Sequence, residues 1–158
     1  MNTRKTILVL LVLALVLMAL PSASVSACTT CGVGTPGYWK NHPEEWADFV
    51  EWKYFGLDPS KTWTQEMVIE MLEMPTKGDK TYTLFRAVVA AKLNYHVGNT
   101  GDCWCVGEPY YYARMWLLED HPVGSGVKAS SKAWKQAEPW YLELDAYNNG
   151  LLCAPARD

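Results

Sequence analysis

Residues 82–96 read YTLFRAVVAAKLNYH, and this stretch carries the strongest helix signal in the chain. Its apolar side chains recur at the spacing of one wide helical face, and its alanines allow a neighbouring helix to approach closely. Gly98 is placed to end the helix. The apolar face consists of Leu84, Phe85, Val88, Val89, Ala91 and Tyr95. The stretch therefore predicts a long helix that is buried along most of one side.

Working outward from this helix, the sequence predicts two helices before it and two after it. Three of them begin at a capping residue and one at Glu108-Pro109, and each ends at a Gly or a Pro. The two earlier helices are bounded by Asn41 at the start and Gly56 at the end, and by Thr62 and Pro75. The two later helices are bounded by Glu108 and Pro122, and by Ser130 or Ser131 and Gly150. Gly124-Ser125-Gly126 is expected to be the most flexible linker. Because no clean run of alternating apolar residues is present, we expect an all-α domain, a small irregular helical bundle of about five helices closed by a disulfide.

The first 27 residues have the features of a removable export signal. The positive charges of Arg4 and Lys5 precede 14 apolar residues, Ile7 to Leu20, and a small, polar cleavage region follows. The apolar run is short for a bilayer span, which takes about 20 residues. The chain thus divides into a signal peptide, residues 1–27, and a single helical extracellular domain, residues 28–158.

Residues 25–28, Val-Ser-Ala-Cys, resemble the lipobox of exported lipoproteins, in which the Cys accepts a lipid. Lipidation of Cys28 would leave an even set of four cysteines out of five. Two alternatives remain open, free secretion and a lipid anchor at Cys28. In either case we expect contact with a membrane only through that anchor.

Composition restricts the class of partner. The chain has 14 Lys and Arg against 17 Asp and Glu, and removal of the signal takes two basic residues, which leaves a net charge of −5. Because nucleic acid recognition needs clustered Lys and Arg, we expect no nucleic acid partner. All 8 Trp, 9 Tyr and 3 Phe lie after the signal. Not all of these rings fit in one small core, and exposed Tyr and Trp favour contact with a protein or a carbohydrate.

The cysteines predict disulfides, since an exported domain meets oxidising conditions. The candidates are Cys31, Cys103, Cys105 and Cys153, which allow three connectivities, and the sequence does not choose among them. A pair between Cys103 and Cys105 is awkward because near neighbours fit disulfide geometry only in a tight turn. A bridge from Cys31 to Cys153 would close almost the entire mature chain.

The alternative use of these thiols is metal binding or redox chemistry. Cys28, Cys31, Cys103 and Cys105 have chelating spacings, and His42, His96 and His121 could join them. Export favours oxidised pairs instead, so we expect no cofactor. A secreted hydrolase has less support, because the Gly-x-Ser-x-Gly, His-Glu-x-x-His and phosphate-loop motifs are all missing. We therefore assign no catalytic residues and expect a non-enzymatic protein.

Residues 34–46, GTPGYWKNHPEEW, resemble the opening motif of an exported bacterial and archaeal domain, the "TPGYWKNHPxxW" domain. Residues 84–94, LFRAVVAAKLN, and 144–153, LDAYNNGLLC, are similar to further parts of that family in the same order. The resemblance implies an extracellular domain of unestablished biochemical role, often attached to larger surface proteins. It also implies a Cys near each end, which would correspond to Cys31 and Cys153. The Cys103-Trp104-Cys105 insertion departs from the family pattern.

Three aromatic segments are the candidate contact sites: the Pro-Gly turn, the Cys103-Trp104-Cys105 loop and the helix after it. Thr35-Pro36-Gly37-Tyr38 suits a type II turn, which would present its neighbours for stacking on a sugar ring or a protein. The alternative is that Trp39 and Trp46 belong to the core and that Asn41 only caps a helix. The candidate contact residues are Tyr38, Trp39, Lys40, His42, Trp104, Tyr110 and Tyr111. We expect an extracellular or cell-surface module whose partner is a surface protein or a glycan.

Overall fold

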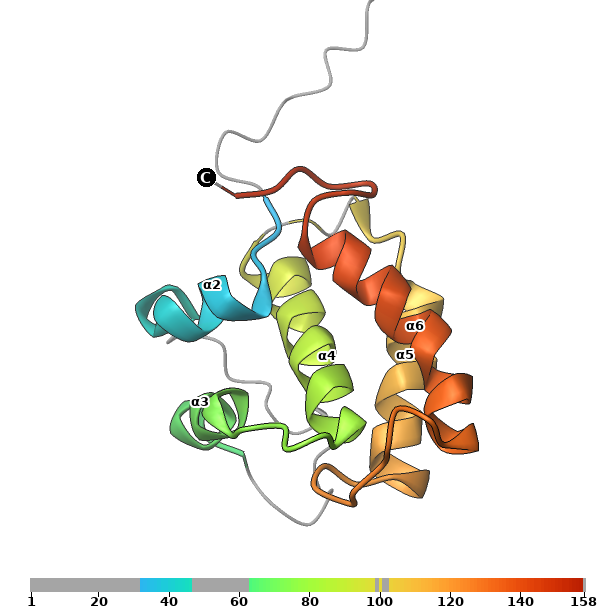
Figure 1. The fold of residues 1–158 in the computed structure, drawn as a ribbon. Coiled ribbons are helices and arrows are strands. Elements are labelled where there is room, and N and C mark those ends of the chain that lie inside the picture. Colours follow the sequence, from blue (N-terminus) through green and yellow to red (C-terminus); the bar gives the residue numbers. More distant parts are fainter. Residues whose placement is uncertain (1–31, 47–62, 99, 101–102, 158) are drawn as a thin grey trace, which may run out of the picture.

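A computed structural model of the chain describes residues 32–46, 63–98, 100 and 103–157 (Figure 1). The predicted signal peptide, Cys28, Cys31 and most of the first predicted helix lie outside these residues. The helices are α2 (Pro36–Asn41), α3 (Gln65–Glu73), α4 (Lys80–His96), α5 (Gly107–Met115) and α6 (Lys132–Asn148), with a 3-10 turn η1 (Pro43–Trp46) and a π-helical turn η4 (Trp116–Asp120). The described ranges contain five α-helices and no strand, which confirms the all-α prediction.

Helix α4 is the centre of the bundle, and α2, α3, α5 and α6 all pack against it (Figure 1). Its apolar face is buried as predicted, except that Tyr95 at its last turn is 36% exposed. The helix begins two residues earlier than expected because Asp79 caps it. The Asp79 carboxylate accepts the Thr81 N–H at 3.0 Å and the Gly126 N–H at 2.8 Å. The glycine-rich segment is therefore fixed to the start of α4 rather than free.

A fully buried polar residue, Asn94, lies on the otherwise apolar α4. Its Oδ1 accepts the Gly34 N–H at 2.6 Å and the Trp39 indole N–H at 2.8 Å. Its Nδ2 donates to the Gly34 carbonyl at 3.1 Å and to Asn148 Oδ1 at 2.8 Å. The side-chain amide thus makes all four hydrogen bonds that it is able to make.

The Asn94 network continues into α6. Asn148 Nδ2 donates to the Ala87 carbonyl at 3.0 Å, which ties the end of α6 back to the middle of α4. Thr100 donates its hydroxyl proton to the Asn94 carbonyl at 2.8 Å and also contacts the Tyr147 hydroxyl. Because a hydroxyl has one proton, Tyr147 is the donor to Thr100. Residues 34–46, 84–94 and 144–153 therefore meet at one buried polar cluster.

The opening segment differs from its prediction. Thr35 is the N-cap of α2, and its Oγ1 accepts the Tyr38 N–H at 3.1 Å. Pro36 occupies the first helical position, where its missing N–H is not needed, so residues 35–38 start a helix instead of a type II turn. Asn41 is the last residue of α2 and caps no helix start. The expectation that Trp39 and Trp46 belong to the core is confirmed, since both are buried.

The remaining helix starts follow local capping. Thr64 caps α3 by accepting the Met67 N–H, and Ser131 caps α6 by accepting the Trp134 N–H. The end of α6 leads into a turn at Gly150, whose φ is +70° and whose backbone lies against Ala156. A side chain at Gly150 would be strained and would clash, so this turn needs glycine.

The two ends of the described chain lie side by side. Val33 donates to the Pro155 carbonyl at 2.8 Å, and Arg157 donates to the Val33 carbonyl at 2.9 Å. These bonds form an isolated parallel bridge between Val33 and Ala156. The bridge joins the two ends at the end of the molecule where α6 finishes (Figure 1).

We expect Asn94→Ala to lower the free energy of unfolding by about 3–5 kcal/mol, because it leaves several buried donors and acceptors without partners. Urea unfolding followed by circular dichroism measures this loss. Asn41→Ala is the matched control, since Asn41 is exposed on α2, and it should change stability by less than about 0.5 kcal/mol. Equal stabilities of the two variants would contradict the role given to Asn94.

Candidate functional site

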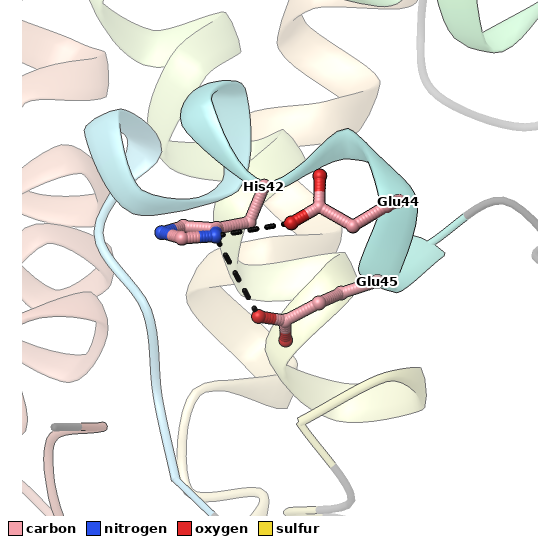
Figure 2. Close-up of side chains that lie close together, drawn as sticks. All are labelled: His42, Glu44 and Glu45. Atoms are coloured by element: carbon pink, nitrogen blue, oxygen red, sulfur yellow. Dashed lines mark hydrogen bonds and ion pairs between the residues drawn. The ribbon is translucent and has the colours of Figure 1, made fainter.

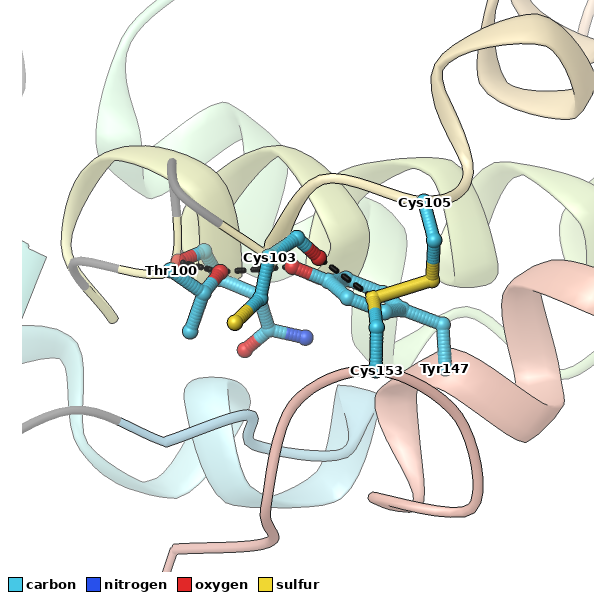
Figure 3. Close-up of a disulfide and its surroundings, with 6 residues drawn as sticks. Thr100, Cys103, Cys105, Tyr147 and Cys153 are labelled. Atoms are coloured by element: carbon cyan, nitrogen blue, oxygen red, sulfur yellow. Dashed lines mark hydrogen bonds between the residues drawn. A yellow bond between two sulfur atoms is a disulfide. The ribbon is translucent and has the colours of Figure 1, made fainter. Parts of the chain in front are cut away.

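A disulfide joins Cys105, just before α5, to Cys153, just after α6, with Cα atoms 6.2 Å apart (Figure 3). The prediction of a disulfide-closed bundle is confirmed. The bridge from Cys31 to Cys153 is not formed, because Cys153 is bonded to Cys105. Among the described cysteines Cys103 is free, and Cys105 is not available as a thiolate, which removes the four-thiolate metal site.

The disulfide holds Trp104 beside a surface pocket of about 360 Å³. The lining residues are Lys92, Tyr95, His96, Trp104 and Tyr110. Three of them come from the last turns of α4 at positions i, i+3 and i+4, which share one helix face. The others come from the Cys103–Cys105 loop and from α5. Pockets for small molecules have volumes of about 300–1,000 Å³, so this one suits a small ligand.

Trp104 is the central ring of the pocket. The Tyr95 ring lies 4.8 Å from it, the Tyr110 ring 5.4 Å and the Tyr147 ring 5.7 Å, and all three meet it edge to face. Gly107 lies behind the indole, where a Cβ would come within 2.9 Å of Nε1. The ring therefore has a fixed orientation, with edge-to-face contacts of the kind that aromatic pairs prefer.

The pocket also contains polar groups. Lys92 Nζ lies 5.9 Å from the centroid of the Tyr95 ring, and the Tyr95 and His96 rings are 4.7 Å apart. Burial raises the pKa of Tyr110 to about 12, and the nearby Arg114 charge opposes that rise only partly. The Tyr110 hydroxyl therefore keeps its proton at neutral pH. The site combines aromatic faces with hydrogen-bond donors.

The opening motif forms a second cluster whose polar groups bind one another (Figure 2). Tyr38 donates to Glu45 Oε1 at 2.6 Å, and Arg157 lies 3.1 Å from Glu45 Oε2. His42 stacks on Tyr38 at 4.4 Å and has its Nδ1 3.2 Å from Glu44 Oε1. The hydrogen bond to Glu45, more than burial, raises the pKa of Tyr38. The pKa of Glu44 is lowered first by its own backbone N–H and then by His42.

This second cluster offers little to a cation or a partner. Donor atoms of His42, Glu44 and Glu45 lie within 4.8 Å of one another. Both Glu45 oxygens are already engaged, and the positive Arg157 would oppose a metal ion. Tyr38 and His42 are half-buried, and their polar groups already contact Glu45 and Glu44.

The structure sorts the predicted contact residues into four groups. Trp104 and Tyr110 line the pocket, as a contact role requires. Trp39 is fully buried and donates to Asn94, so its inclusion as a contact residue was wrong. Lys40, in the last turn of α2, is half-buried.

Tyr111 is exposed but lies outside the pocket. Its ring is 5.5 Å from that of Tyr112, which in turn stacks on Trp140 at 5.7 Å. These three rings form a separate aromatic surface over α5 and α6.

The sequence did not indicate Lys92 and Tyr95 as pocket residues, and it indicated His96 only as a possible metal ligand. Their spacing places all three on one helix face. Only the packing of α4 against the Trp104 loop shows that this face lines a pocket. The chain matches no protein-family model, no curated protein and no solved structure. Within the described ranges, every helix is too short or too polar to cross a membrane.

Removal of the disulfide tests its part in the fold. The two cysteines are 48 residues apart, and closing such a loop stabilises by about 4 kcal/mol in the chain-entropy model. We expect the double variant Cys105→Ala, Cys153→Ala to lose about 2–4 kcal/mol in urea unfolding. Cys103→Ser should match the parent chain. If both variants unfolded like the parent, this bond would not be what closes the bundle.

The raised pKa of Tyr110 predicts alkaline destabilisation. A tyrosine in the unfolded chain titrates near pH 10, whereas Tyr110 in the folded chain titrates near 12. The stability from the neutral phenol is therefore complete below about pH 10 and falls as the pH rises toward 12. Urea unfolding at several alkaline pH values should show a shallower decline for Tyr110→Phe than for Tyr111→Phe. Identical slopes would count against the burial of this hydroxyl.

Proposed function

We propose that this protein is a non-enzymatic extracellular or cell-surface module that binds a carbohydrate in the pocket around Trp104. The observation that carries the proposal is the fixed Trp104 ring, flanked by Tyr95 and Tyr110 at a surface pocket. The C–H face of a sugar ring packs on an aromatic ring, and its hydroxyl groups need hydrogen-bond partners around that ring.

Two features of the pocket support a sugar as its ligand. Its aromatic rings provide rigid apolar area that loses little conformational entropy on binding. Lys92 and His96 are the polar residues among those that line it. A pocket that combines aromatic and polar residues suits a ligand that is itself amphipathic, as a pyranose is.

The residues of the pocket favour binding over cleavage. Glycoside hydrolysis uses a pair of Asp or Glu carboxylates about 5–9.5 Å apart. None of the five residues that line the pocket is Asp or Glu, and none is Ser or Cys. The lining residues therefore provide recognition without an acid, a base or a nucleophile of this kind.

An exported location is part of the proposal. The Cys105–Cys153 bond is of the kind that persists in oxidising compartments, and residues 1–27 have the pattern of a signal peptide. Free secretion and a lipid anchor at Cys28 are both compatible with it. Membership of the "TPGYWKNHPxxW" domain family is proposed on the same footing, from the three motif stretches.

A protein contact is the second candidate function, and it is favoured by a different surface. Tyr111 is 54% exposed and Tyr112 is 44% exposed, and with Trp140 they form a continuous set of rings. Exposed Tyr and Trp are common at protein interfaces. This surface could serve a protein partner while the pocket holds a sugar.

Trp104→Ala tests the proposed function. A glycan array identifies a bound oligosaccharide, and isothermal titration then measures its affinity for each variant. We expect Trp104→Ala to weaken binding at least tenfold, a change of about 1.4 kcal/mol. Trp140→Ala is the matched control, because this half-buried Trp does not line the pocket, and it should bind as the parent does. An array without any bound glycan, or equal weakening by both substitutions, would overturn the proposal.

A further inference from the structure

A second pocket, of about 180 Å³, lies between α4 and α6 and shares no residue with the Trp104 pocket. Its lining residues come from the first turn of α2, from one face of α4 and from one face of α6. They are Pro36, Thr83, Arg86, Ala87, Tyr141 and Asp145, all within the described ranges. We call this the α4–α6 pocket.

The guanidinium of Arg86 is only partly satisfied by the protein. Its Nη2 donates to the Met74 carbonyl. Its Nε is buried and has no hydrogen-bond partner. Buried donors are rarely left in this state, because an unpaired one is unfavourable. The α4 wall of the pocket therefore has a positive group with capacity for a further acceptor.

Asp145 provides the opposite charge on the α6 wall. Burial, followed by the Asp145 charge and a hydrogen bond to its carboxylate, raises the pKa of Tyr141. The phenol is therefore the donor, and it positions the carboxylate from one turn earlier on α6. An ionised carboxylate has about four acceptor sites, so Asp145 is able to accept further donors.

Arg86 and Asp145 do not neutralise each other. Among the described residues, no ion pair or hydrogen bond joins these two side chains, although both line the same pocket. A ligand with a single charge would meet one opposite charge and one like charge, so its attraction and repulsion would offset each other. A ligand with both charges is attracted at both ends, through charge-assisted hydrogen bonds that are about twice as strong as neutral ones.

We propose that the α4–α6 pocket binds a small zwitterion, and that the ligand class is an α-amino acid with a short side chain. The carboxylate of the ligand meets Arg86, and its ammonium group meets Asp145. The pocket has the volume of about six water molecules, which suits a molecule of the size of alanine. Ala87, next to Arg86 on α4, has only a methyl group and leaves room for it. This site is independent of the proposed carbohydrate site.

The experiment compares three small ligands by NMR titration: L-alanine, acetate and ethylamine. Acetate and ethylamine are similar in size to alanine, but each carries only one of its two charges. We expect L-alanine to bind at least tenfold more tightly than either of them. The amide signals of residues 83–87 and 141–145 should shift, and the indole signal of Trp104 should not.

Asp145→Asn removes the negative charge and keeps the shape of the side chain. It should weaken L-alanine binding at least tenfold and strengthen acetate binding, because the like charge is gone. A purely structural role for Asp145 would not strengthen acetate binding. Glu143→Gln is the matched control, since it removes the same charge from an exposed position on α6 outside the pocket, and it should bind as the parent does.

Arg86→Met makes the reciprocal change. It should weaken L-alanine binding at least tenfold and strengthen ethylamine binding, because the positive charge that repels an ammonium group is removed. Arg86 also holds the Met74 carbonyl, so thermal unfolding checks that each variant is folded. If Arg86→Met does not fold, Asp145→Asn and its control still decide the question.

The outcomes concern this pocket alone, because Trp104→Ala tests the carbohydrate site separately. Acetate that binds as tightly as L-alanine would overturn the zwitterion in favour of a simple anion. Shifts confined to residues around Trp104, or no binding of any of the three ligands, would overturn the α4–α6 site. Equal weakening by Asp145→Asn and Glu143→Gln would also overturn it. A preference for L-alanine that Asp145→Asn removes and Glu143→Gln keeps supports the proposal.

Discussion

The four hydrogen bonds of the Asn94 amide are the interaction on which the rest of the structure depends. They reach the segment before α2, the Trp39 indole and the end of α6, which are 54 to 60 residues away in sequence. Each group left unpaired in this buried place would cost about 1–3 kcal/mol. The rotation of α4 about its axis is fixed in this way, and that rotation also decides where Tyr95 and His96, the next two residues, are presented. The polar core thus positions the pocket.

Most of the helices follow from local sequence, because capping and apolar spacing are local. Residues 82–96 predict α4 almost to its ends, and Ser131 marks the start of α6. The exception is α2, where Thr-Pro fits either a turn or the first residues of a helix, since Pro sets a similar φ in both. The burial of Trp39, which follows this dipeptide, favours the helix over the turn. The Asn94 network has no local signal, because one Asn in an apolar helix does not indicate which distant backbone it meets.

The candidate site was predictable only in part, for the same reason. An aromatic excess around Trp104 and Tyr110 suggests exposed rings and led to two of the five pocket residues. The other three belong to α4, and nothing in their own stretch separates a core-facing Tyr95 from a pocket-facing one. The disulfide partner of Cys153 likewise depends on which loop lies next to the end of α6. That choice is set by packing between segments far apart in the sequence. Trp39 was named as a contact residue because a turn at residues 35–38 would present it, with burial in the core as the alternative. The acceptor that decides for the core, Asn94, lies 55 residues further along the chain.

Tyr147 is a fully buried core residue that contacts Trp104, one of the residues that line the pocket. Its hydroxyl contacts Thr100 (Figure 3) and ends the hydrogen-bonded chain that begins at Asn94. Its ring meets the Trp104 ring edge to face. The wall of the pocket is therefore pre-organised by the same contacts that hold the fold. A ligand that stacks on Trp104 meets a surface that has already lost its conformational freedom, so the entropy of ordering this wall is not subtracted from the affinity. Specificity can then change through the outer residues of α4 and α5 while the supporting ring stays in place.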